Sequence, residues 1–282
     1  MIEVLRTGPL ALVMDAGRPG HAAVGVSPSG AFDRAAFARG ARLVGNDPGR
    51  HAGIEITLGG FAFRALAGWR IALTGATCPL AIDGREAAWD AAIDVAAGQV
   101  VTVGTPSSGL RSYLSVADGV GVDPVLGSRS TDVLSGLGPP PLRPGDLLGV
   151  GVPGRPARPG PEPPRPRTVT DDVLELLPGP QSDWLADPDD LATTWTVSPS
   201  SNRIGVRLDG PAILRRGGEI PSQPLVRGAV QLPPSGRPVV FGPDHPTTGG
   251  YPVVAVLDDA SCDRLAQLRP GLTCTLTWRG GA

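Results

Sequence analysis

Short apolar runs separated by glycine- and proline-containing turns dominate this chain. Many of the runs have the length and the β-branched residues that are typical of strands. The clearest are Ile54–Leu58, Arg70–Thr74, Val100–Val103, Ser112–Val116, Arg203–Leu208, Pro238–Phe241, Val253–Leu257 and Leu272–Trp278. The pattern predicts a protein that is built mainly from short β-strands.

Two segments show a helical pattern instead. The first follows Ser29 and Gly30 and runs over Phe32–Leu43, with Ser29 as the expected N-cap. The second covers Ser261–Leu268 and is stopped by Pro270 and the glycine after it. Strands outnumber helices severalfold, so the predicted fold class is mainly β, with a β-barrel or β-sandwich and about one helix in each half.

The composition agrees with this prediction and indicates two domains. Of 282 residues, 40 are glycine, 32 are proline and 41% are hydrophobic, which is too apolar for a disordered chain. Residues 153–168 are dense in proline and arginine and are expected to form an extended linker. We therefore expect an N-terminal β-domain over residues 1–152 and a C-terminal β-domain over residues 169–282. A Leu-Arg-Pro-Gly sequence at residues 142–145 and again at 268–271 supports two similar halves.

All 25 basic residues are arginine, and the chain has no lysine. The chain therefore cannot supply a Walker A lysine, a Schiff-base lysine or a biotinylated lysine. Any anion must be bound by arginine, hydroxyls or backbone N–H groups. The net charge of −2 gives no reason to expect nucleic-acid binding.

The cysteines, the histidines and the lengths of the apolar segments exclude further classes of protein and of site. Cys78, Cys262 and Cys274 are widely spaced, and the histidines lack partners at ligand spacing, so neither a disulfide scaffold nor a metal site is expected. We expect no membrane association, because no stretch approaches the length of a membrane span and no signal-peptide pattern is seen. The sequence is typical of a soluble, cytoplasmic protein.

The stretch Asp244–Pro252, between two predicted strands, concentrates reactive side chains. It holds an acid, an imidazole, two hydroxyls, a phenol and a Gly-Gly pair. It is about twice as long as a tight hairpin needs, and its glycines allow close backbone approach to a ligand. We interpret it as part of a functional site; the alternative is a polar turn, because Gly-Gly and proline are ordinary turn residues.

Two segments of the N-terminal half are further candidates. The glycine-rich run after Asp15 opens the first predicted helix, so its N–H groups could bind an anion beside Arg18. The alternative is an Asp15–Arg18 ion pair that stabilises a turn. The segment Leu126–Asp132 contains Arg129 and three hydroxyls, which suit a carboxylate, phosphate or amide ligand, or equally a capped turn.

Taken together, these segments resemble the second subunit of the allophanate hydrolase and urea amidolyase group. Its members are also described as the C subunit of 5-oxoprolinase and as biotin-dependent carboxyltransferase-like proteins. In the first half the resemblance rests on residues 15–20, 29–33, Asn46, Glu55, 73–76, 113–117 and 125–132. In the second half it rests on residues 177–181, 202–208, 228–234 and 247–252. The family usually has glutamine before Thr247, where this chain has Pro246, so substrate choice is expected to differ if that glutamine contacts the ligand.

The resemblance implies tandem cyclophilin-like β-barrels and a constitutive partner, the first subunit of the group, with the active cleft between the two. The implied activity is that of an ATP-dependent 5-oxoprolinase, which opens the lactam of 5-oxoproline to L-glutamate together with a third subunit. Because the chain lacks lysine, ATP is expected in an atypical site or on a partner. ATP would activate the carbonyl oxygen, so the site needs anion stabilisers and an acid or base.

The roles that follow are predictions for individual residues. Catalytic candidates are Asp15, Asp244 and His245. Substrate-binding candidates are Arg18, Ser29, Asp33, Arg129, Ser130, Thr131, Arg203, Gln231, Thr247, Thr248, Gly249, Gly250 and Tyr251. Arg18, Arg129 and Arg203 would stabilise anions. We expect Asp244→Ala and Thr248→Val to abolish activity with little change in thermal stability.

Two alternatives stay open. The first is a carboxyltransferase subunit that uses carboxybiotin carried by another protein, with urea or a similar small amide as acceptor. The second is a non-catalytic regulatory module, since some family members are linked to control of a histidine-kinase inhibitor that is itself a first-subunit homologue.

Overall fold

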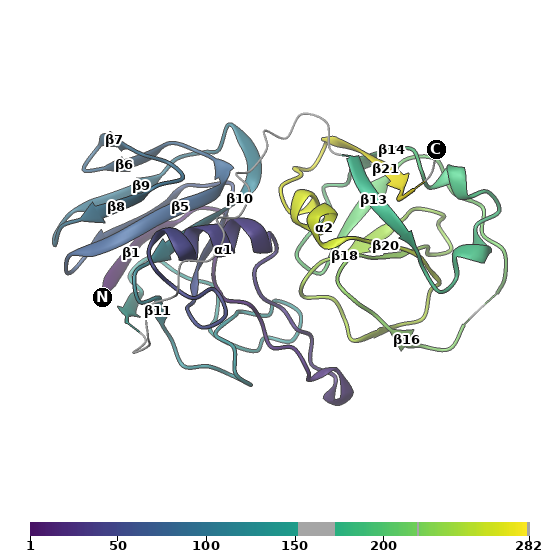
Figure 1. Ribbon diagram of the computed structural model, residues 1–282, viewed down its shortest axis with the longest axis horizontal. Coiled ribbons are helices and arrows are strands. Elements are labelled where there is room, and N and C mark those ends of the chain that lie inside the picture. The colour runs from purple at the N-terminus through teal and green to yellow at the C-terminus, as the bar shows by residue number, and fades with distance from the viewer. Residues whose placement is uncertain (152–172, 219, 281–282) are drawn as a thin grey trace. The chain divides into compact units, whose positions relative to one another are not determined.

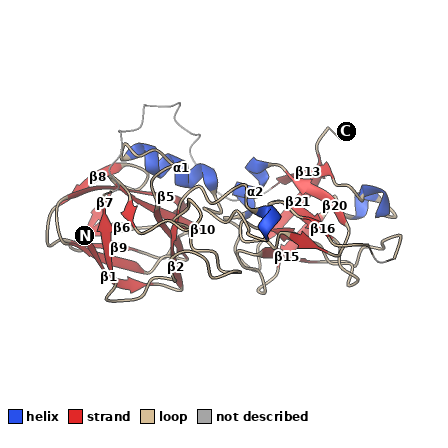
Figure 2. Ribbon diagram, turned by 90° about the horizontal axis from the view of Figure 1, so that it is seen from below, coloured by secondary structure: helices blue, strands red, loops and turns tan. Residues whose placement is uncertain are grey.

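The computed structural model describes residues 1–151, 173–218 and 220–280, and within them it is mainly β (Figure 2). The chain divides into two compact units. The N-terminal unit comprises Met1–Arg18, Ser29–Asp132 and Gly136–Thr168, and the C-terminal unit comprises Pro19–Pro28, Val133–Ser135 and Val169–Ala282. The expected linker at residues 153–168 lies outside the described residues, and the expected domain boundaries stay a prediction.

The N-terminal unit contains two sheets. The seven-stranded sheet has the order β11-β12-β1-β4-β9-β6-β7, and the five-stranded sheet has the order β2-β3-β10-β5-β8. The first sheet consists of β1 (Ile2–Thr7), β4 (Phe61–Ala65), β6 (Leu80–Ile82), β7 (Arg85–Ala87), β9 (Val100–Val103), β11 (Val120–Gly121) and β12 (Leu147–Val150). The second consists of β2 (Leu10–Met14), β3 (Gly53–Thr57), β5 (Trp69–Thr77), β8 (Ala92–Val95) and β10 (Ser108–Val116).

The main core of this unit is formed by both sheets. Ile2 and Phe63 of the first sheet and Ile54 and Leu73 of the second belong to one cluster of fully buried side chains. Strand β10 is buried on both faces, because a second cluster around Phe37 covers its other side. This double burial explains why the polar residues of the strand, such as Arg111 and Ser112, are buried along with its apolar ones.

Helix α1 (Arg34–Leu43) packs on β5 and β10 (Figure 1). Its N-cap is Asp33, whose Oδ1 accepts the N–H of Ala36 at 2.8 Å. The expectation that Ser29 caps a helix starting at Phe32 is therefore wrong. Ser29 and Gly30 have φ angles of 50° and 93°, so the chain makes a turn there before Asp33 reaches the extended conformation of an N-cap.

Gly40 lets α1 approach the sheet closely. A Cβ atom at Gly40 would lie 2.8 Å from Thr74 Oγ1 and 2.9 Å from Ser115 Oγ. Gly40→Ala is therefore expected to destabilise the fold by about 1–3 kcal/mol, although the same change in an open helix is stabilising. Urea unfolding measures the effect.

Ser115→Ala is the matched control for this close approach. The Ser115 hydroxyl is buried without a hydrogen-bond partner among the described residues, so its removal alone is expected to leave stability unchanged or higher. In the Gly40→Ala background it should restore part of the loss. Full stability of the Gly40→Ala protein would contradict this account of the packing.

The C-terminal unit contains a closed barrel with the order β13-β20-β17-β18-β15-β14-β21. Its strands are β13 (Val173–Pro178), β14 (Thr194–Val197), β15 (Gly205–Asp209), β17 (Ala229–Gln231), β18 (Val239–Phe241), β20 (Val253–Leu257) and β21 (Thr273–Trp278). Strands β13 and β21 pair in parallel and close the barrel, and the other pairs are antiparallel. Alternate residues such as Leu174, Leu176, Leu208 and Leu276 fill the interior and are fully buried.

Smaller elements complete this unit. They are the two-stranded sheet of β16 (Gln223–Pro224) and β19 (Thr248–Gly249), helix α2 (Asp259–Leu265) and the 3-10 turns η1 (Ala22–Val24), η2 (Ser182–Trp184) and η3 (Pro188–Asp190). Asp258 caps α2 through the N–H of Ser261. All the strands expected from the sequence are present with small shifts at their ends, and the mainly β prediction is confirmed, with one closed barrel in the described residues.

Candidate functional site

The stretch Asp244–Pro252 connects β18 to β20 in the C-terminal unit, and it has two different halves. Asp244 and His245 are 0% and 3% exposed, so the acid and the imidazole are buried. Thr248, Gly250 and Tyr251 are exposed. The sequence pattern predicts one polar loop. In the structure, the first two residues of the loop are buried, and its second half is exposed to solvent, where a ligand can reach it.

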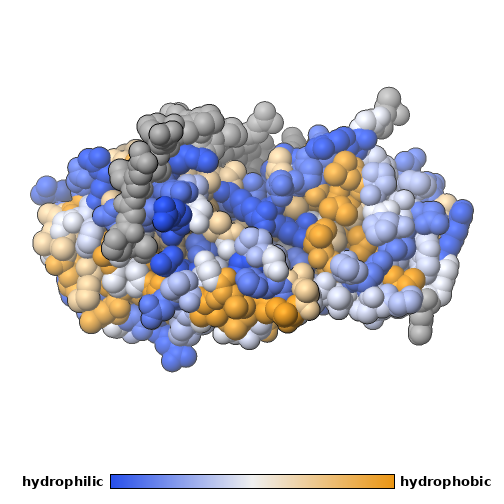
Figure 3. All heavy atoms as spheres, turned by 60° about the horizontal axis from the view of Figure 1, so that its bottom comes forward, coloured by the Kyte–Doolittle hydropathy of each residue, from blue (hydrophilic) through white to orange (hydrophobic). Residues whose placement is uncertain are grey.

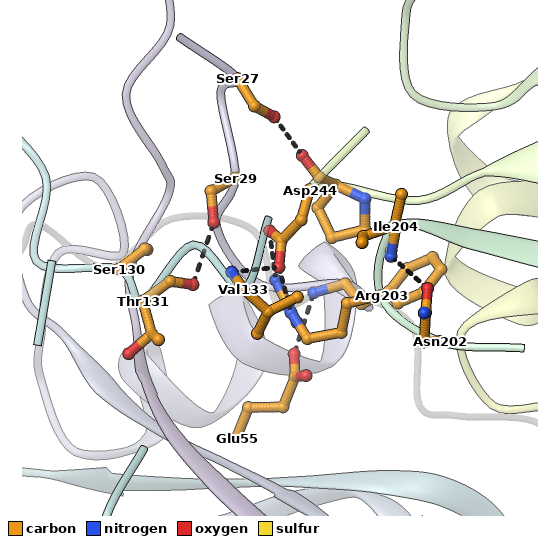
Figure 4. Close-up of polar contacts among 12 residues, drawn as sticks. Ser27, Ser29, Glu55, Ser130, Thr131, Val133, Asn202, Arg203, Ile204 and Asp244 are labelled. Carbon is orange, nitrogen blue, oxygen red and sulfur yellow. Dashed lines mark hydrogen bonds and ion pairs between the residues drawn. The ribbon is translucent and has the colours of Figure 1, made fainter. Parts of the chain in front are cut away.

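Asp244 forms a buried ion pair with Arg203. Its carboxylate accepts hydrogen bonds from Arg203 Nε at 2.9 Å and Nη2 at 3.1 Å, and the Arg203 side chain is 2% exposed. Asp244 Oδ2 also accepts the N–H of Val133 at 3.2 Å (Figure 4). Ser27 Oγ donates to the carbonyl of the neighbouring Pro243 at 3.0 Å. The pair thus fixes short segments that are distant in sequence onto the barrel.

His245 is held by its own backbone neighbour. Its Nδ1 lies 2.7 Å from the carbonyl oxygen of Pro246, and a carbonyl only accepts, so Nδ1 carries the proton. The ring also packs edge-on against Phe241, with centroids 6.4 Å apart. The contact uses a backbone carbonyl that any residue supplies, so proline at position 246 does not disturb it.

The exposed half of the loop is fixed through its backbone. The Thr247 carbonyl accepts the N–H of Leu225 at 3.0 Å, and the Tyr251 carbonyl accepts the side-chain amide of Gln231 at 3.0 Å. A Cβ atom at Gly249 would lie 2.6 Å from that amide nitrogen, so a larger residue there would displace the Gln231 side chain. As a result, the loop displays the Thr248 hydroxyl and the Tyr251 phenol from a defined backbone.

In the N-terminal unit, Asp15 is the centre of a buried hydrogen-bond cluster. Its Oδ1 accepts the hydroxyls of Ser128 and Ser130, both at 2.6 Å. Backbone N–H groups of Gly17 and Arg129 donate to Oδ1 and Oδ2 at 2.8 and 2.6 Å. The glycine-rich run and the hydroxyl-rich segment therefore do bind an anion together, and this anion is the Asp15 carboxylate itself.

The nearby arginines bind carbonyl oxygens. Arg18, 1% exposed, donates to Ser130 O and, at 3.3 Å, to Val125 O. Its Nη1 is buried without a partner in the described part of the chain. Arg129 donates to Val122 O at 2.9 Å and to Arg50 O. The contacts of Arg18 are therefore with carbonyl oxygens and not those of the alternative, an Asp15–Arg18 ion pair. The anion-binding roles of Arg18 and Arg129 stay predictions.

Three further predicted site residues lie around the start of α1. Ser29 Oγ donates to the carbonyl of Thr131 at 3.2 Å, and Thr131 Oγ1 donates to Pro139 O at 2.8 Å. Asp33 is the cap of α1. Both hydroxyls and the Asp33 carboxylate are thus engaged with the fold, and their roles in substrate binding stay predictions.

A network that the site prediction missed surrounds Glu55 on β3. Glu55, 1% exposed, accepts hydrogen bonds from Tyr113 Oη at 2.9 Å and the N–H of Phe32 at 3.0 Å. Arg111 lies 3.5 Å from the same carboxylate and 4.5 Å from the centroid of the Phe32 ring. Tyr113 Oη in turn accepts the N–H of Asp33 at 2.7 Å. An acid inside the apolar run Ile54–Leu58 was the sequence signal that could have revealed this network.

Burial raises the pKa of Tyr113 well above its ordinary value of 10.0, and the Glu55 and Asp33 carboxylates raise it further. Below about pH 10 both the folded and the unfolded chain hold this proton. Above it the unfolded chain releases the proton while the folded chain keeps it, so the free energy of unfolding is expected to fall as pH rises. A Tyr251→Phe protein, in which Tyr113 is the remaining tyrosine, allows tyrosinate absorbance to be followed. The absorbance should appear together with unfolding; its appearance in the folded protein would contradict the raised pKa.

Two features of other classes of site are absent from the described residues. No group of three His, Cys, Asp or Glu side chains is placed to hold a metal ion there. Nor does that part of the chain contain a helix that is long and apolar enough to cross a membrane.

Known proteins match this chain over nearly its full length. The family model for the carboxyltransferase domain, subdomain A and B, matches residues 24–278. The C subunit of the 5-oxoprolinase of Escherichia coli (strain K12) is 37% identical over 280 residues, which are 96% of this chain and 89% of that protein.

Larger proteins contain a similar region. Urea amidolyase of Saccharomyces cerevisiae is 30% identical over 96% of this chain, but the chain spans just 16% of that protein. The crystal structure of the K. lactis urea amidolyase superposes with a TM-score of 0.89 at 30% identity, over 98% of this chain and 18% of that one. Because the family model and the E. coli relative both cover most of the sequence, this protein belongs to the carboxyltransferase-domain family that includes the C subunit of 5-oxoprolinase.

Proposed function

We propose that this chain is the C subunit of an ATP-dependent 5-oxoprolinase, a hydrolase that opens the cyclic amide of 5-oxoproline to L-glutamate. The observation that carries the proposal is the 37% identity to the C subunit of the E. coli 5-oxoprolinase, over 96% of this chain and 89% of the relative. A match of that extent leaves no large region of the relative without a counterpart. The enzyme would act as a complex with a first-subunit partner and a third subunit.

Within this function, the exposed half of the loop would contact the substrate. Thr248 and Tyr251 are exposed on a backbone that Gln231 and Leu225 hold in place. A hydroxyl and a phenol can each donate to a lactam carbonyl and accept from a lactam N–H. Asp244 and Arg203 are buried and paired with each other, which supports a role in holding the loop in place over a role in proton transfer. In the N-terminal unit, the Asp15 carboxylate is likewise occupied by hydrogen-bond donors of the chain itself.

The described residues do not fit a phosphate site of the P-loop type. The chain has no lysine. The N-terminus of α1 is capped by the Asp33 carboxylate, and the N–H groups of Gly17 and Arg129 are used by Asp15. The groups that usually bind phosphate are thus occupied by carboxylates of the chain itself. We therefore propose that ATP binds to a partner subunit.

The surface supports a protein partner. Large hydrophobic side chains in the C-terminal unit are exposed, including Val24 at 73%, Val226 at 54% and Leu134 at 46%. Figure 3 shows apolar side chains gathered in patches between polar ones. Large contiguous apolar patches on a surface often mark sites of protein–protein interaction. We also propose that both units are variants of a cyclophilin-like barrel, of which the C-terminal unit has kept the closed form.

The test is reconstitution. Co-purification with the first-subunit partner, followed by addition of the third subunit, should give ATP-dependent release of glutamate from 5-oxoproline. Thr248→Val should reduce this activity by at least about tenfold, because the substrate would lose the hydroxyl that binds it. The fold should be unaffected, because Thr248 is exposed. Thr193→Val, at another exposed threonine of the same unit, is the control and should retain activity. Absence of turnover with all subunits present would overturn the proposal.

A second function is favoured by the 30% identity to urea amidolyase over 96% of this chain. In that case the chain would be a carboxyltransferase subunit, and biotin would be carried by another protein because this chain has no lysine to attach it. Carboxybiotin-dependent carboxylation of urea by the complex, without glutamate release from 5-oxoproline, would select this function. Partner binding without either activity would select the regulatory module.

A further inference from the structure

Gln181 and Gln223 form a reciprocal pair of side-chain amides in the C-terminal unit. Gln181 Nε2 donates to Gln223 Oε1 at 3.0 Å, and Gln223 Nε2 donates to Gln181 Oε1 at 2.7 Å. Both side chains are partly buried. A pair of this kind needs a donor and an acceptor on each side, so it cannot form between two carboxylates or two hydrocarbons.

The pair joins the middle of the candidate loop to its C-terminal end. Gln181 follows β13, and its Oε1 also accepts the N–H of Val253, the first residue of β20. Gln223 lies on β16 and pairs with Gly249 of β19 in the middle of the loop. The two amides thus connect the start of β20 to the strand that supports Thr248.

Strand pairing alone is a weak support for this loop. The β16–β19 ladder consists of two residue pairs, Gln223 with Gly249 and Pro224 with Thr248. Pro224 has no N–H and cannot donate to the ladder. So short a ladder is marginal by itself, and the loop depends on further contacts, of which the Leu225–Thr247 and Gln231–Tyr251 hydrogen bonds are two.

We propose that the Gln181–Gln223 amide pair positions the loop Thr247–Pro252, so that Gln181 and Gln223 are positioning residues for Thr248 and Tyr251. Neither glutamine touches the substrate in this proposal. The pair ties β16, the ladder partner of β19, to the start of β20, so the distance between the Thr248 hydroxyl and the Tyr251 phenol stays fixed. The link to catalysis rests on the proposed function; the ordering of the loop does not.

Glutamate variants give a direct test, because their hydrogen-bonding capacity depends on pH. In Gln181→Glu or Gln223→Glu, the ionised carboxylate accepts but cannot donate, so one hydrogen bond is lost and two acceptor oxygens face each other. A protonated carboxyl group has one donor and one acceptor and restores the pair. Acidification through the carboxyl pKa, ordinarily about 4.3, should therefore restore the loop.

The measurement is backbone hydrogen exchange of residues 247–253 on the full chain, with wild type at each pH as the control. Near neutral pH we expect roughly tenfold faster exchange in both variants, which is the size of effect that one lost hydrogen bond produces. Strand β14 should be unchanged and serves as the internal reference. Unchanged exchange of the loop near neutral pH, or no recovery at low pH, would overturn the proposal.

Activity measurements on the reconstituted complex separate this proposal from the proposed function. Loss of the defined loop position should lower kcat more than it raises KM, with recovery toward low pH in step with the exchange data. Faster hydrogen exchange of the loop with unchanged 5-oxoproline turnover would confirm that the glutamine pair orders the loop. It would also show that the loop is not part of the catalytic site. Gln223→Leu, which cannot be rescued at any pH, is the matched comparison.

Discussion

Replacement of Asp244 by alanine is expected to destabilise the protein by about 3–5 kcal/mol, the usual effect of removing one partner from a buried ion pair. Asp244 and Arg203 are 0% and 2% exposed, and the pair makes two hydrogen bonds of 2.9 and 3.1 Å. Without the carboxylate, the guanidinium loses this compensation inside the protein, and the N–H of Val133 loses its acceptor. The sequence alone predicts lost activity with unchanged stability, and the buried geometry reverses the second half of that expectation.

A double variant distinguishes a charge effect from a general packing effect. Arg203→Met combined with Asp244→Leu removes both charges and keeps side-chain volume, so it should be clearly more stable than Asp244→Ala in urea unfolding. Asp94→Ala is the exposed control: Arg70 and Asp94 form a similar pair, at 3.0 and 3.1 Å, with side chains 56% and 74% exposed. Solvent screens that pair, and little change is expected. Equal effects of Asp94→Ala and Asp244→Ala would contradict the argument.

Replacement of Asp15 by alanine is expected to be at least as damaging, at about 4 kcal/mol or more. Two serine hydroxyls and two backbone N–H groups donate to this carboxylate within 2.6–2.8 Å. Each buried donor that is left without an acceptor costs about 1–3 kcal/mol. Thermal melting should therefore show a large loss, and much of the protein is expected in the insoluble fraction.

Smaller changes at the same cluster make the Asp15 prediction quantitative. Ser128→Ala removes one donor and leaves the carboxylate with three, so the loss should be about 1 kcal/mol. Asp123→Ala, at an exposed acid in the same unit, should have no measurable effect. A stable Asp15→Ala protein that lacks activity would show instead that Asp15 is catalytic, as the sequence analysis proposed.

Local sequence patterns located the clearest strands, because apolar and β-branched runs fit a pleated, half-buried surface. The runs Val100–Val103 and Val253–Leu257 are strands with those bounds. The error at the start of α1 was also local in origin. Ser29 and Asp33 are both good N-caps, and the choice between them depends on the backbone turn at Ser29 and Gly30, which the pattern of side chains does not show.

The candidate site was predictable as a set of segments but not as a set of roles. The pattern singled out the segments around Asp15, Arg129 and Asp244. It gave no information about burial, which decides whether a carboxylate is free to react or already saturated with donors. Glu55 contributes to the family resemblance but was not predicted as a site residue. Its partners Tyr113 and Phe32 are far away in sequence, so the sequence pattern does not reveal their contact.

The order of residues is sufficient to predict that the chain is mainly β, to show that it contains no lysine for phosphate or biotin chemistry, and to relate its polar segments to one family. These properties depend on composition and on short-range patterns. The tertiary structure alone decided which polar groups are buried, because burial results from contacts between residues far apart in the chain. It made Asp15 and Asp244 the acceptors of buried hydrogen bonds and left Thr248 and Tyr251 exposed on a loop fixed by Gln181, Gln223 and Gln231.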